Sequence, residues 1–237
     1  MKVLVIAAHP DDEVLGMGGT IKKHTKNGDD VKIVIMATGI SSRRSTNYKN
    51  STKYDVAKDT LKKMQMQIKE LRRDAAKAAK VLGVTKLEFE EFPDNEMDTV
   101  SNLAITKKIE EKINTFKPKM VYTHSQFDIN VDHRALYFAT LTATRPKKNQ
   151  VVSEVRAFEV PSSTEWYFPT MFSPNIFVDI TKELPAKLKA LTMYKNEIEK
   201  FPHPRSTAAI SAIAKKWGSM AGFNRAEAFY LVRKLQD

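Results

Sequence analysis

Short apolar runs alternate along the chain with longer segments in which apolar residues return every three or four positions. The first run, Val3 to Ala8, is rich in β-branched residues and shows no polar alternation, which is typical of a strand buried on both faces of a parallel sheet. Similar runs predict strands at 31–38, 87–92, 120–123, 155–160 and 176–180. The pattern predicts an α/β fold: a Rossmann-like, mostly parallel sheet with helices on both faces and a small C-terminal extension.

Periodic segments between these runs predict the helices. The most regular one extends from Tyr54 to Leu82 and ends at Gly83, and its first half, about 45–66, carries many lysines. Further helices are expected at 14–24, 102–116, 182–196 and 207–217. Because no linker or repeat divides the chain, we expect a single domain over residues 1–237, with residues from about 150 onward as a candidate lobe shaping the substrate site.

A dense set of ligand and proton-transfer groups, His-Pro-Asp-Asp-Glu at 9–13, follows the first strand directly. Open α/β sheets bind ligands at the carboxyl ends of their strands, so chemistry is expected here. His9 and Asp12 suit a zinc ion, and Asp11 between them could act as general base on a metal-bound water. The alternative is a helix N-terminus complemented by acidic residues. The whole combination after a buried strand favours the metal site.

The segment AHPDDE after an N-terminal VLVIA strand resembles the PIG-L (LmbE-like) family of N-acetylglucosamine deacetylases. Further similarity lies in THSQFDINVDHRAL at 123–136, in FPHPRS at 201–206 and in AEAF at 226–229. These matches extend over nearly the whole chain. The resemblance implies a zinc-dependent hydrolase that removes the acetyl group from an N-acetyl amino sugar of the GlcNAc type. It leaves open whether that sugar is free, nucleotide-linked, lipid-linked or part of a polymer.

The same resemblance implies roles for the second motif. His133 would be the third metal ligand, brought to the others because both loops leave the same edge of the sheet. Asp132 would either cap the helix that begins there or orient an imidazole. The family most often has a His that stabilises the oxyanion where this chain has Asn130, so the donor is either the Asn130 amide or His124.

Four residues are implied to bind the substrate. Arg43, with Arg44 as a substitute, follows the second strand, and Asp94 follows the third. His203 and Arg205 lie in the proline-stiffened FPHPRS segment, where they would bind an anionic part of the substrate. Without the resemblance, an exposed basic loop and an Asp-Asn turn explain Arg43 and Asp94 about as well.

Composition narrows the partners. The chain has no cysteine, which excludes a thiolate metal site and a cysteine nucleophile. Its apolar start is too short for a signal peptide, and no stretch approaches the roughly 18–20 apolar residues of a membrane span. We therefore expect a cytoplasmic protein without membrane insertion. The net charge of +11 fits either solvated lysine-rich helix faces or steering of an anionic substrate. No nucleic-acid-binding motif appears, so no nucleic-acid partner is expected.

Two other functions stay open at this point. One keeps the zinc and cuts a different amide, on a sugar-derived or thiol-conjugated substrate. The other is a non-catalytic module that binds nucleotides or nucleic acid, which the complete set of metal ligands disfavours. The sequence also leaves open whether another divalent metal replaces zinc and whether the protein forms homo-oligomers.

Overall fold

A single seven-stranded sheet forms the centre of the protein, with strand order β3-β2-β1-β4-β5-β7-β6. The computed structural model describes residues 1–40 and 58–236. Strands β1 to β5 run parallel to one another, whereas β7 is antiparallel to both β5 and β6. The strands are β1 (Lys2–Ala7), β2 (Asp30–Ala37), β3 (Lys86–Phe92), β4 (Met120–His124), β5 (Glu154–Phe158), β6 (Ile176–Asp179) and β7 (Ala226–Lys234).

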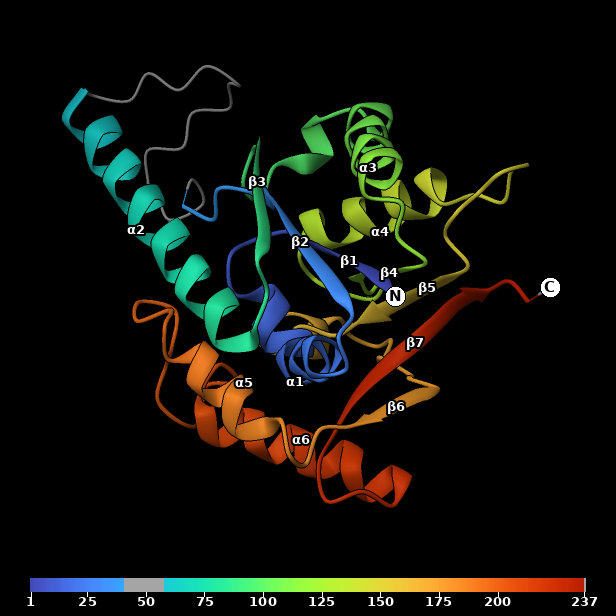
Figure 1. The fold of residues 1–237 in the computed structure, drawn as a ribbon. Helices are drawn as coiled ribbons and strands as arrows, with labels where there is room; N and C mark the ends of the chain where they lie inside the picture. The colour runs from blue at the N-terminus through green and yellow to red at the C-terminus, as the bar shows by residue number, and fades with distance from the viewer. Residues whose placement is uncertain (41–57, 237) are drawn as a thin grey trace.

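Helices cover both faces of this sheet (Figure 1). Alternate residues of β1 explain why: Val3 and Val5 pack in a core with α1, α2 and α5, whereas Leu4 and Ile6 pack in a second core with α3 and α4. A strand buried on both faces reads as one continuous apolar run. The α/β fold predicted from the sequence is therefore confirmed. The helices are α1 (Asp12–Lys26), α2 (Lys58–Leu82), α3 (Asn102–Phe116), α4 (Val131–Ala143), α5 (Leu184–Leu191) and α6 (Thr207–Ala221).

Two glycines allow α1 to lie close to its neighbours. A Cβ at Gly16 would be 2.5 Å from the Phe158 ring, and one at Gly19 would be 2.8 Å from Ile180. The helix is kinked at Met17, and the carboxylate of Glu227 accepts hydrogen bonds from the freed backbone N–H groups of Gly19 and Thr20. Glu227 therefore anchors β7 to α1 and lies outside the functional site.

The C-terminal part of the chain extends the same sheet. After β5, the chain forms β6 at the edge and returns as β7 between β5 and β6. The sequence pattern predicted the first two of these strands but not β7. Helix α5 is shorter than the predicted segment 182–196, because the chain leaves the helix after Leu191 to form the loop that reaches the site. The lysine-rich extension expected at 45–66 lies mostly outside the described residues.

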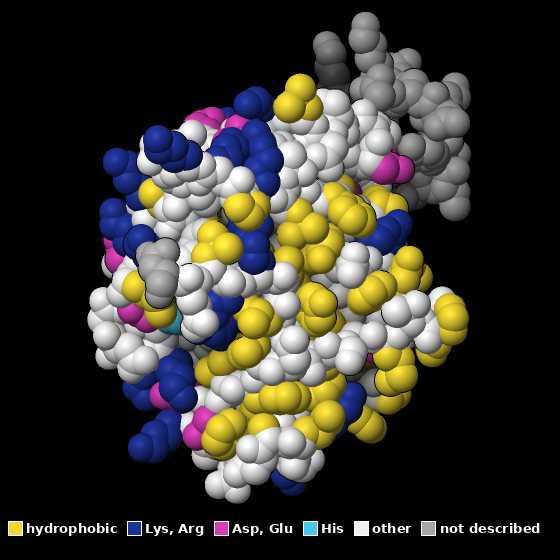
Figure 2. Space-filling model, turned by 90° about the vertical axis from the view of Figure 1, so that its right-hand side faces the viewer, with side chains coloured by type: hydrophobic (Ala, Val, Ile, Leu, Met, Phe, Trp, Pro, Cys, Tyr) yellow, Lys and Arg dark blue, Asp and Glu magenta, His cyan; other side chains and the backbone are white. Residues whose placement is uncertain are grey.

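The described surface includes an apolar face. Figure 2, which views the side on the right in Figure 1, shows hydrophobic side chains gathered over a broad part of it. Exposed large apolar side chains include Phe127, Phe138 and Tyr230. Such surfaces often take part in protein contacts, and homo-oligomerisation stays a prediction. None of the described helices combines the length and the apolar content needed to cross a bilayer.

A half-buried carboxyl that directly follows β5 makes stability depend on pH. Burial raises the pKa of Glu159 from 4.5 to about 7, although the Trp217 indole N–H donates to this carboxylate. The unfolded chain ionises first, so the free energy of unfolding falls as pH rises from about 4.5 to 7. We expect Glu159→Gln to remove this loss and to gain about 1–3 kcal/mol at pH 8 but little at pH 4.5. Urea unfolding at pH 4.5 and pH 8 measures the change in the free energy of unfolding, with Glu70→Gln at an exposed position as the control. An equal gain at both pH values would contradict the assignment of the effect to Glu159.

Candidate active site

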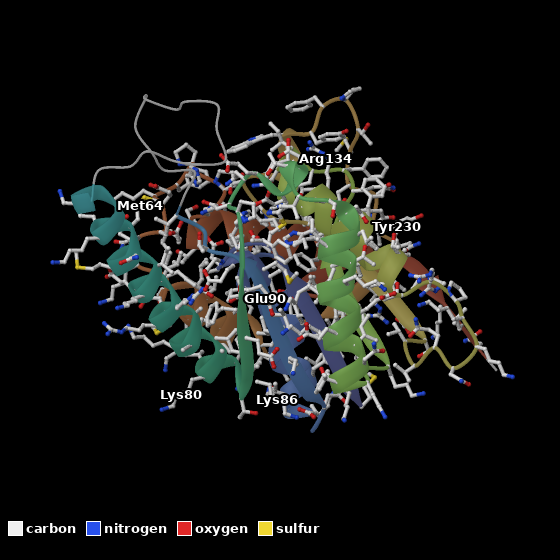
Figure 3. All side chains as sticks on the ribbon, turned by 90° about the horizontal axis from the view of Figure 1, so that it is seen from above. Met64, Lys80, Lys86, Glu90, Arg134 and Tyr230 are labelled. Carbon is white, nitrogen blue, oxygen red and sulfur yellow. The ribbon has the colours of Figure 1, made fainter. Side chains whose placement is uncertain are left out.

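The predicted site residues that the structure describes, all except Arg43, meet where the strand order reverses direction. β1 pairs with β2 on one side and β4 on the other, so the loops that follow β1 and β4 diverge at the carboxyl edge of the sheet, the usual ligand site of such folds. In Figure 3, Lys86 at the start of β3 and Arg134 in the first turns of α4 lie at opposite ends of the molecule, and Arg134 directly follows His133 in the chain. A cavity of about 490 Å³ opens here, lined in part by His9, Asp11, Asp94, Asn130, His203 and Arg205.

His9, Asp12 and His133 converge below this cavity. Asp12 Oδ2 lies 3.3 Å from His9 Nδ1 and 3.2 Å from His133 Nε2, and ligand atoms of all three residues lie within 4.8 Å of one another. The same carboxylate oxygen accepts a hydrogen bond from the backbone N–H of His9, which fixes the turn. Two imidazoles and a carboxylate are a donor set of catalytic zinc sites.

The nitrogen of His133 that points at this group supports a metal. Its Nε2 atom is buried and makes no well-aligned hydrogen bond within the described part of the chain. Buried polar atoms almost always have a partner, so an orphaned nitrogen calls for an explanation. A cation held by the three side chains would provide one, because it would accept the lone pair of this nitrogen. The residues present therefore fit a zinc ion.

A second carboxylate supports each histidine from behind. His9 Nε2 lies 2.9 Å from Asp132 Oδ2, and His133 Nδ1 lies 3.0 Å from Asp128 Oδ2. Such contacts set the tautomer and the orientation of metal-binding imidazoles. The side chain of Asn130 accepts the N–H of Asp132 and caps α4, so Asp132 is not the helix cap. The carboxylate oxygens of Asp132 also accept the backbone N–H groups of Asn95 and Met97 and so hold the loop after β3.

The charges of these carboxylates favour a cation. Burial lowers the pKa of His133, but Asp12 and Asp128 outweigh it and raise the value to about 9. The pKa of His9 is likewise raised well above 6.5, since hydrogen bonds to Asp12, Asp132 and Asp94 exceed the effect of burial. The negative surroundings of both rings thus stabilise a positive charge at this position, whether a proton or a metal ion supplies it.

Asp11 lies beside the metal group and faces the cavity. Its backbone has a φ of 108°, a left-handed conformation that is uncommon for a residue with a side chain. Its Oδ2 atom accepts a hydrogen bond from the Arg205 guanidinium at 3.0 Å. Burial raises the pKa of Asp11 well above 3.8, and the positive charge of Arg205 offsets only part of this effect. The carboxyl therefore takes up a proton more readily than an exposed one does.

Two buried groups hold Asp11 from below. The Glu13 carboxylate accepts a hydrogen bond of 3.1 Å from the backbone N–H of Asp11. The Tyr194 hydroxyl donates to the same carboxylate from the loop after α5. Burial raises the pKa of Glu13 to about 7, with the Tyr194 hydrogen bond opposing it. The strained turn is thus fixed by contacts from a distant part of the chain.

The two candidates for an oxyanion donor lie in different places. Asn130 lines the cavity, and its amide nitrogen donates to Asn95 Oδ1. His124 is completely buried and stacks on His133 with ring centroids 3.9 Å apart. Its Nε2 atom accepts the backbone N–H of Ala8, and burial lowers its pKa well below 6.5. The neutral ring keeps its one N–H on Nδ1, which is buried and has no partner in the described part of the chain, and His124 is not among the residues that line the cavity.

The residues expected to bind substrate fall into two groups. Asp94, His203 and Arg205 line the cavity, and Asp94 Oδ1 lies 3.1 Å from His9 Nε2. Trp166 also lines the cavity, and its ring meets the His203 ring edge-on, with the ring centroids 6.4 Å apart. Arg43 lies outside the described residues.

The chain matches the model of the family described as PIG-L, GlcNAc-PI de-N-acetylase, over residues 4–144, which is more than half of its length. It belongs to the PIG-L family. A curated relative is the diacetylchitobiose deacetylase of Thermococcus kodakarensis, 27% identical over 98% of this chain and 83% of the relative.

Solved structures share the fold of this PIG-L family protein. The N,N'-diacetylchitobiose deacetylase from Pyrococcus horikoshii aligns with a TM-score of 0.75 at 23% identity, over 98% of this chain and 84% of that one. The 4-carboxy-2-hydroxymuconate hydratase from Pseudomonas putida aligns with a TM-score of 0.74 at 20% identity, over 100% and 98%. The fold alone thus serves different reactions, and function must be argued from the site.

Asp128 was not expected from the sequence to take part in the site. Its contact with His133 leads to a testable prediction. Burial opposes ionisation of Asp128, but the His133 charge and hydrogen bonds from Ser163 and Thr164 outweigh it and lower its pKa. We expect Asp128→Asn to weaken zinc binding about 10- to 100-fold, because the orientation of His133 is no longer fixed. Competition with a chelator measures this, with exposed Asp98→Asn as the control. Equal zinc affinity in both variants would show that Asp128 has no such role.

Proposed function

We propose that this PIG-L family protein is a zinc-dependent N-deacetylase that hydrolyses the acetamide of a GlcNAc-type amino sugar to the free amine and acetate. The observation that carries the proposal is the convergence of His9, Asp12 and His133 beside Asp11 at the floor of a cavity. The deacetylase relatives support the reaction class.

The metal ligands in this proposal are His9, Asp12 and His133. A bound zinc ion supplies Lewis acidity, which lowers the pKa of water towards 7 and polarises a carbonyl group. Other divalent cations would also act as Lewis acids, with different strengths. Two imidazoles and one carboxylate are a donor set that suits zinc. Asp132 and Asp128 each contact one nitrogen of an imidazole, so that the other nitrogen of each ring lies next to Asp12 Oδ2, where it would hold the ion.

Asp11 is the general base and then the general acid. It removes a proton from the water that attacks the acetamide carbonyl, and it returns this proton to the amine as the C–N bond breaks. Burial raises its pKa above the ordinary value, which makes the carboxylate a stronger base than an exposed one. Arg205 holds the carboxylate oxygen in place during the exchange.

Asn130 is the oxyanion donor in this account. Its amide uses one N–H for Asn95, and an amide nitrogen carries two. The second is offered to the oxygen that gains charge as water adds to the carbonyl. Asp132 acts indirectly, as the residue that positions His9 and the loop after β3.

The substrate sugar occupies the cavity above these groups. Asp94 accepts hydrogen bonds from sugar hydroxyls, and His203, Arg205 and the Trp166 ring form walls that contact the sugar. Arg43 stays a proposed contact from outside the described residues. A cytoplasmic location likewise stays a prediction.

Acetate release from N-acetylglucosamine and diacetylchitobiose, before and after chelation, tests the function. We expect turnover with zinc, none after chelation, and recovery on adding zinc back. The alternative, an amidase for larger acyl groups, predicts faster release from amides bulkier than acetyl on the same sugar. Activity that is unaffected by chelation would contradict the proposal.

A further inference from the structure

A turn shortly after β5 contacts two different parts of the candidate active site. It comprises residues 162–165, with the sequence Ser-Ser-Thr-Glu, and lies far along the chain from the first motif at 9–13. Ser162 lines the cavity, whereas Ser163 and Thr164 are buried. The hydroxyls of these three residues divide between the cavity side and the interior, and each side has its own charged partner.

On the cavity side, Ser162 is linked to the proposed base. Its hydroxyl accepts a hydrogen bond of 2.8 Å from Arg205 Nε. A terminal nitrogen of the same guanidinium donates to Asp11 Oδ2 at 3.0 Å and to Glu197 at 3.2 Å. A guanidinium is planar and rigid, so a contact that holds Nε also holds the direction of the terminal nitrogens. The Ser162 hydroxyl therefore helps to fix the donor that Arg205 presents to Asp11.

On the interior side, the turn is linked to the proposed third metal ligand. The hydroxyls of Ser163 and Thr164 donate to the Asp128 carboxylate, Ser163 to Oδ1 and Thr164 to Oδ2 at 2.7 Å. Oδ2 of Asp128 lies 3.0 Å from His133 Nδ1. Each oxygen of this buried carboxylate is thus held by a hydroxyl of the turn. Such a carboxylate orients the imidazole that it contacts.

The backbone of the turn is unusual and is itself held by a side chain. Ser162 has a φ of 79°, in the left-handed region that favours glycine. The Glu165 carboxylate accepts the backbone N–H groups of Ser162 at 2.7 Å and of Ser163 at 3.1 Å. A serine at a position that suits glycine better is an observation that points to a use for its hydroxyl.

We propose that this turn positions the base and a metal ligand of the proposed deacetylase relative to each other. Ser162 acts through Arg205 on Asp11, and Ser163 with its neighbour acts through Asp128 on the third metal ligand. The proposal rests on the proposed function and adds residues that act through others. Catalysis depends strongly on the mutual placement of the reacting groups, and one turn that holds both sides contributes to it.

Ser162→Gly tests the cavity side. It removes the hydroxyl at a position whose backbone suits glycine, so stability should change little. With zinc-saturated protein we expect kcat for acetate release to fall about fivefold, with KM changed less than about twofold and zinc affinity unchanged. Ser173→Gly, the same change in an exposed loop outside the cavity, should leave all three values unchanged. An unchanged kcat in Ser162→Gly, or a change confined to KM, would overturn the proposal.

A double-mutant cycle determines whether Ser162 acts through Arg205. Arg205→Gln by itself should lower kcat, because Asp11 loses its charged partner. In that background Ser162→Gly should cause no further loss, since the guanidinium that its hydroxyl held is gone. A second loss of about fivefold would show that Ser162 acts by another route and would overturn its assignment.

Ser163→Ala tests the interior side by competition with a chelator, which needs no turnover. We expect zinc affinity to fall about threefold in the otherwise unchanged chain. In an Asp128→Asn background the same change should have no further effect, because the carboxylate that Ser163 holds is absent. Ser173→Ala is the control. Equal zinc affinities in Ser163→Ala and Ser173→Ala would reject the link to the metal ligand.

The NMR signal of the Arg205 Nε–H group provides a measurement of the cavity side that is also independent of turnover. Its absence in Arg205→Gln assigns it. We expect this proton to exchange with water faster in Ser162→Gly than in Ser173→Gly, because a hydrogen-bonded N–H is protected. If no N-acetyl sugar released acetate, the proposed function alone would fail. Equal exchange rates in the two variants would instead reject positioning by Ser162.

Discussion

Asp11→Asn is expected to lose about 10³-fold in kcat for acetate release while keeping one zinc ion per chain. The amide cannot accept the proton from the attacking water or return it to the leaving amine. The metal ligands lie on neighbouring residues and are unchanged. Asn is also suited to the position because it tolerates the left-handed backbone with a φ of 108°. Steady-state acetate assays together with metal analysis measure both parts of the expectation.

Asp98→Asn is the matched control, since it makes the same chemical change at an exposed position outside the cavity. It should keep full activity and full zinc content. If Asp11→Asn retained most of its activity, another group would have to be the base. Loss of zinc in that variant would instead assign Asp11 to the metal.

His133→Gln is expected to lower zinc affinity by more than about 100-fold and to abolish turnover at stoichiometric zinc. Its ring supplies one of the three metal ligands. Even the loss of a group that only supports such a ligand typically lowers metal affinity about 10- to 100-fold. Gln is preferred to Ala because His133 is buried and stacks on His124 at 3.9 Å, so a truncation would leave a cavity. Zinc per chain after dialysis measures the effect, and circular dichroism checks the fold.

His203→Gln provides the comparison for a cavity residue outside the metal group. It should keep its zinc and change mainly KM, because the proposal places it against the sugar. Unchanged zinc affinity in His133→Gln would remove the third ligand from the account. Equal zinc loss in both variants would point to general damage to the loop region.

The strands and the convergence at the site could be predicted from particular residues. The run Val3 to Ala8 has no polar interruption, which is the signature of a strand with helices on both faces, and the structure confirms it. Parallel strands end at a common edge, so groups after β1 and β4 had to lie near each other. Serine is a common residue at the position before a helix, and Ser206 caps α6 by accepting the N–H of Ala209.

Other features depend on contacts that no local pattern encodes. Asp128 supports His133, but an Asp before a helix looks like a turn residue. Glu197 and Tyr194 reach Arg205 and Glu13 only because the chain leaves α5 early. The antiparallel strand β7 was not predicted because apolar and polar residues alternate little along it. Its pairing with β5 depends on tertiary contacts. The roles of the individual site residues stay proposals.

Zinc titration into chelated protein, with acetate release from diacetylchitobiose as the readout, decides whether turnover depends on a bound metal ion. We expect no turnover without metal and a linear rise that saturates at one zinc ion per chain. Full turnover of the chelated protein would contradict this expectation. An equal rise in variants that lack His9, Asp12 or His133 would contradict it as well.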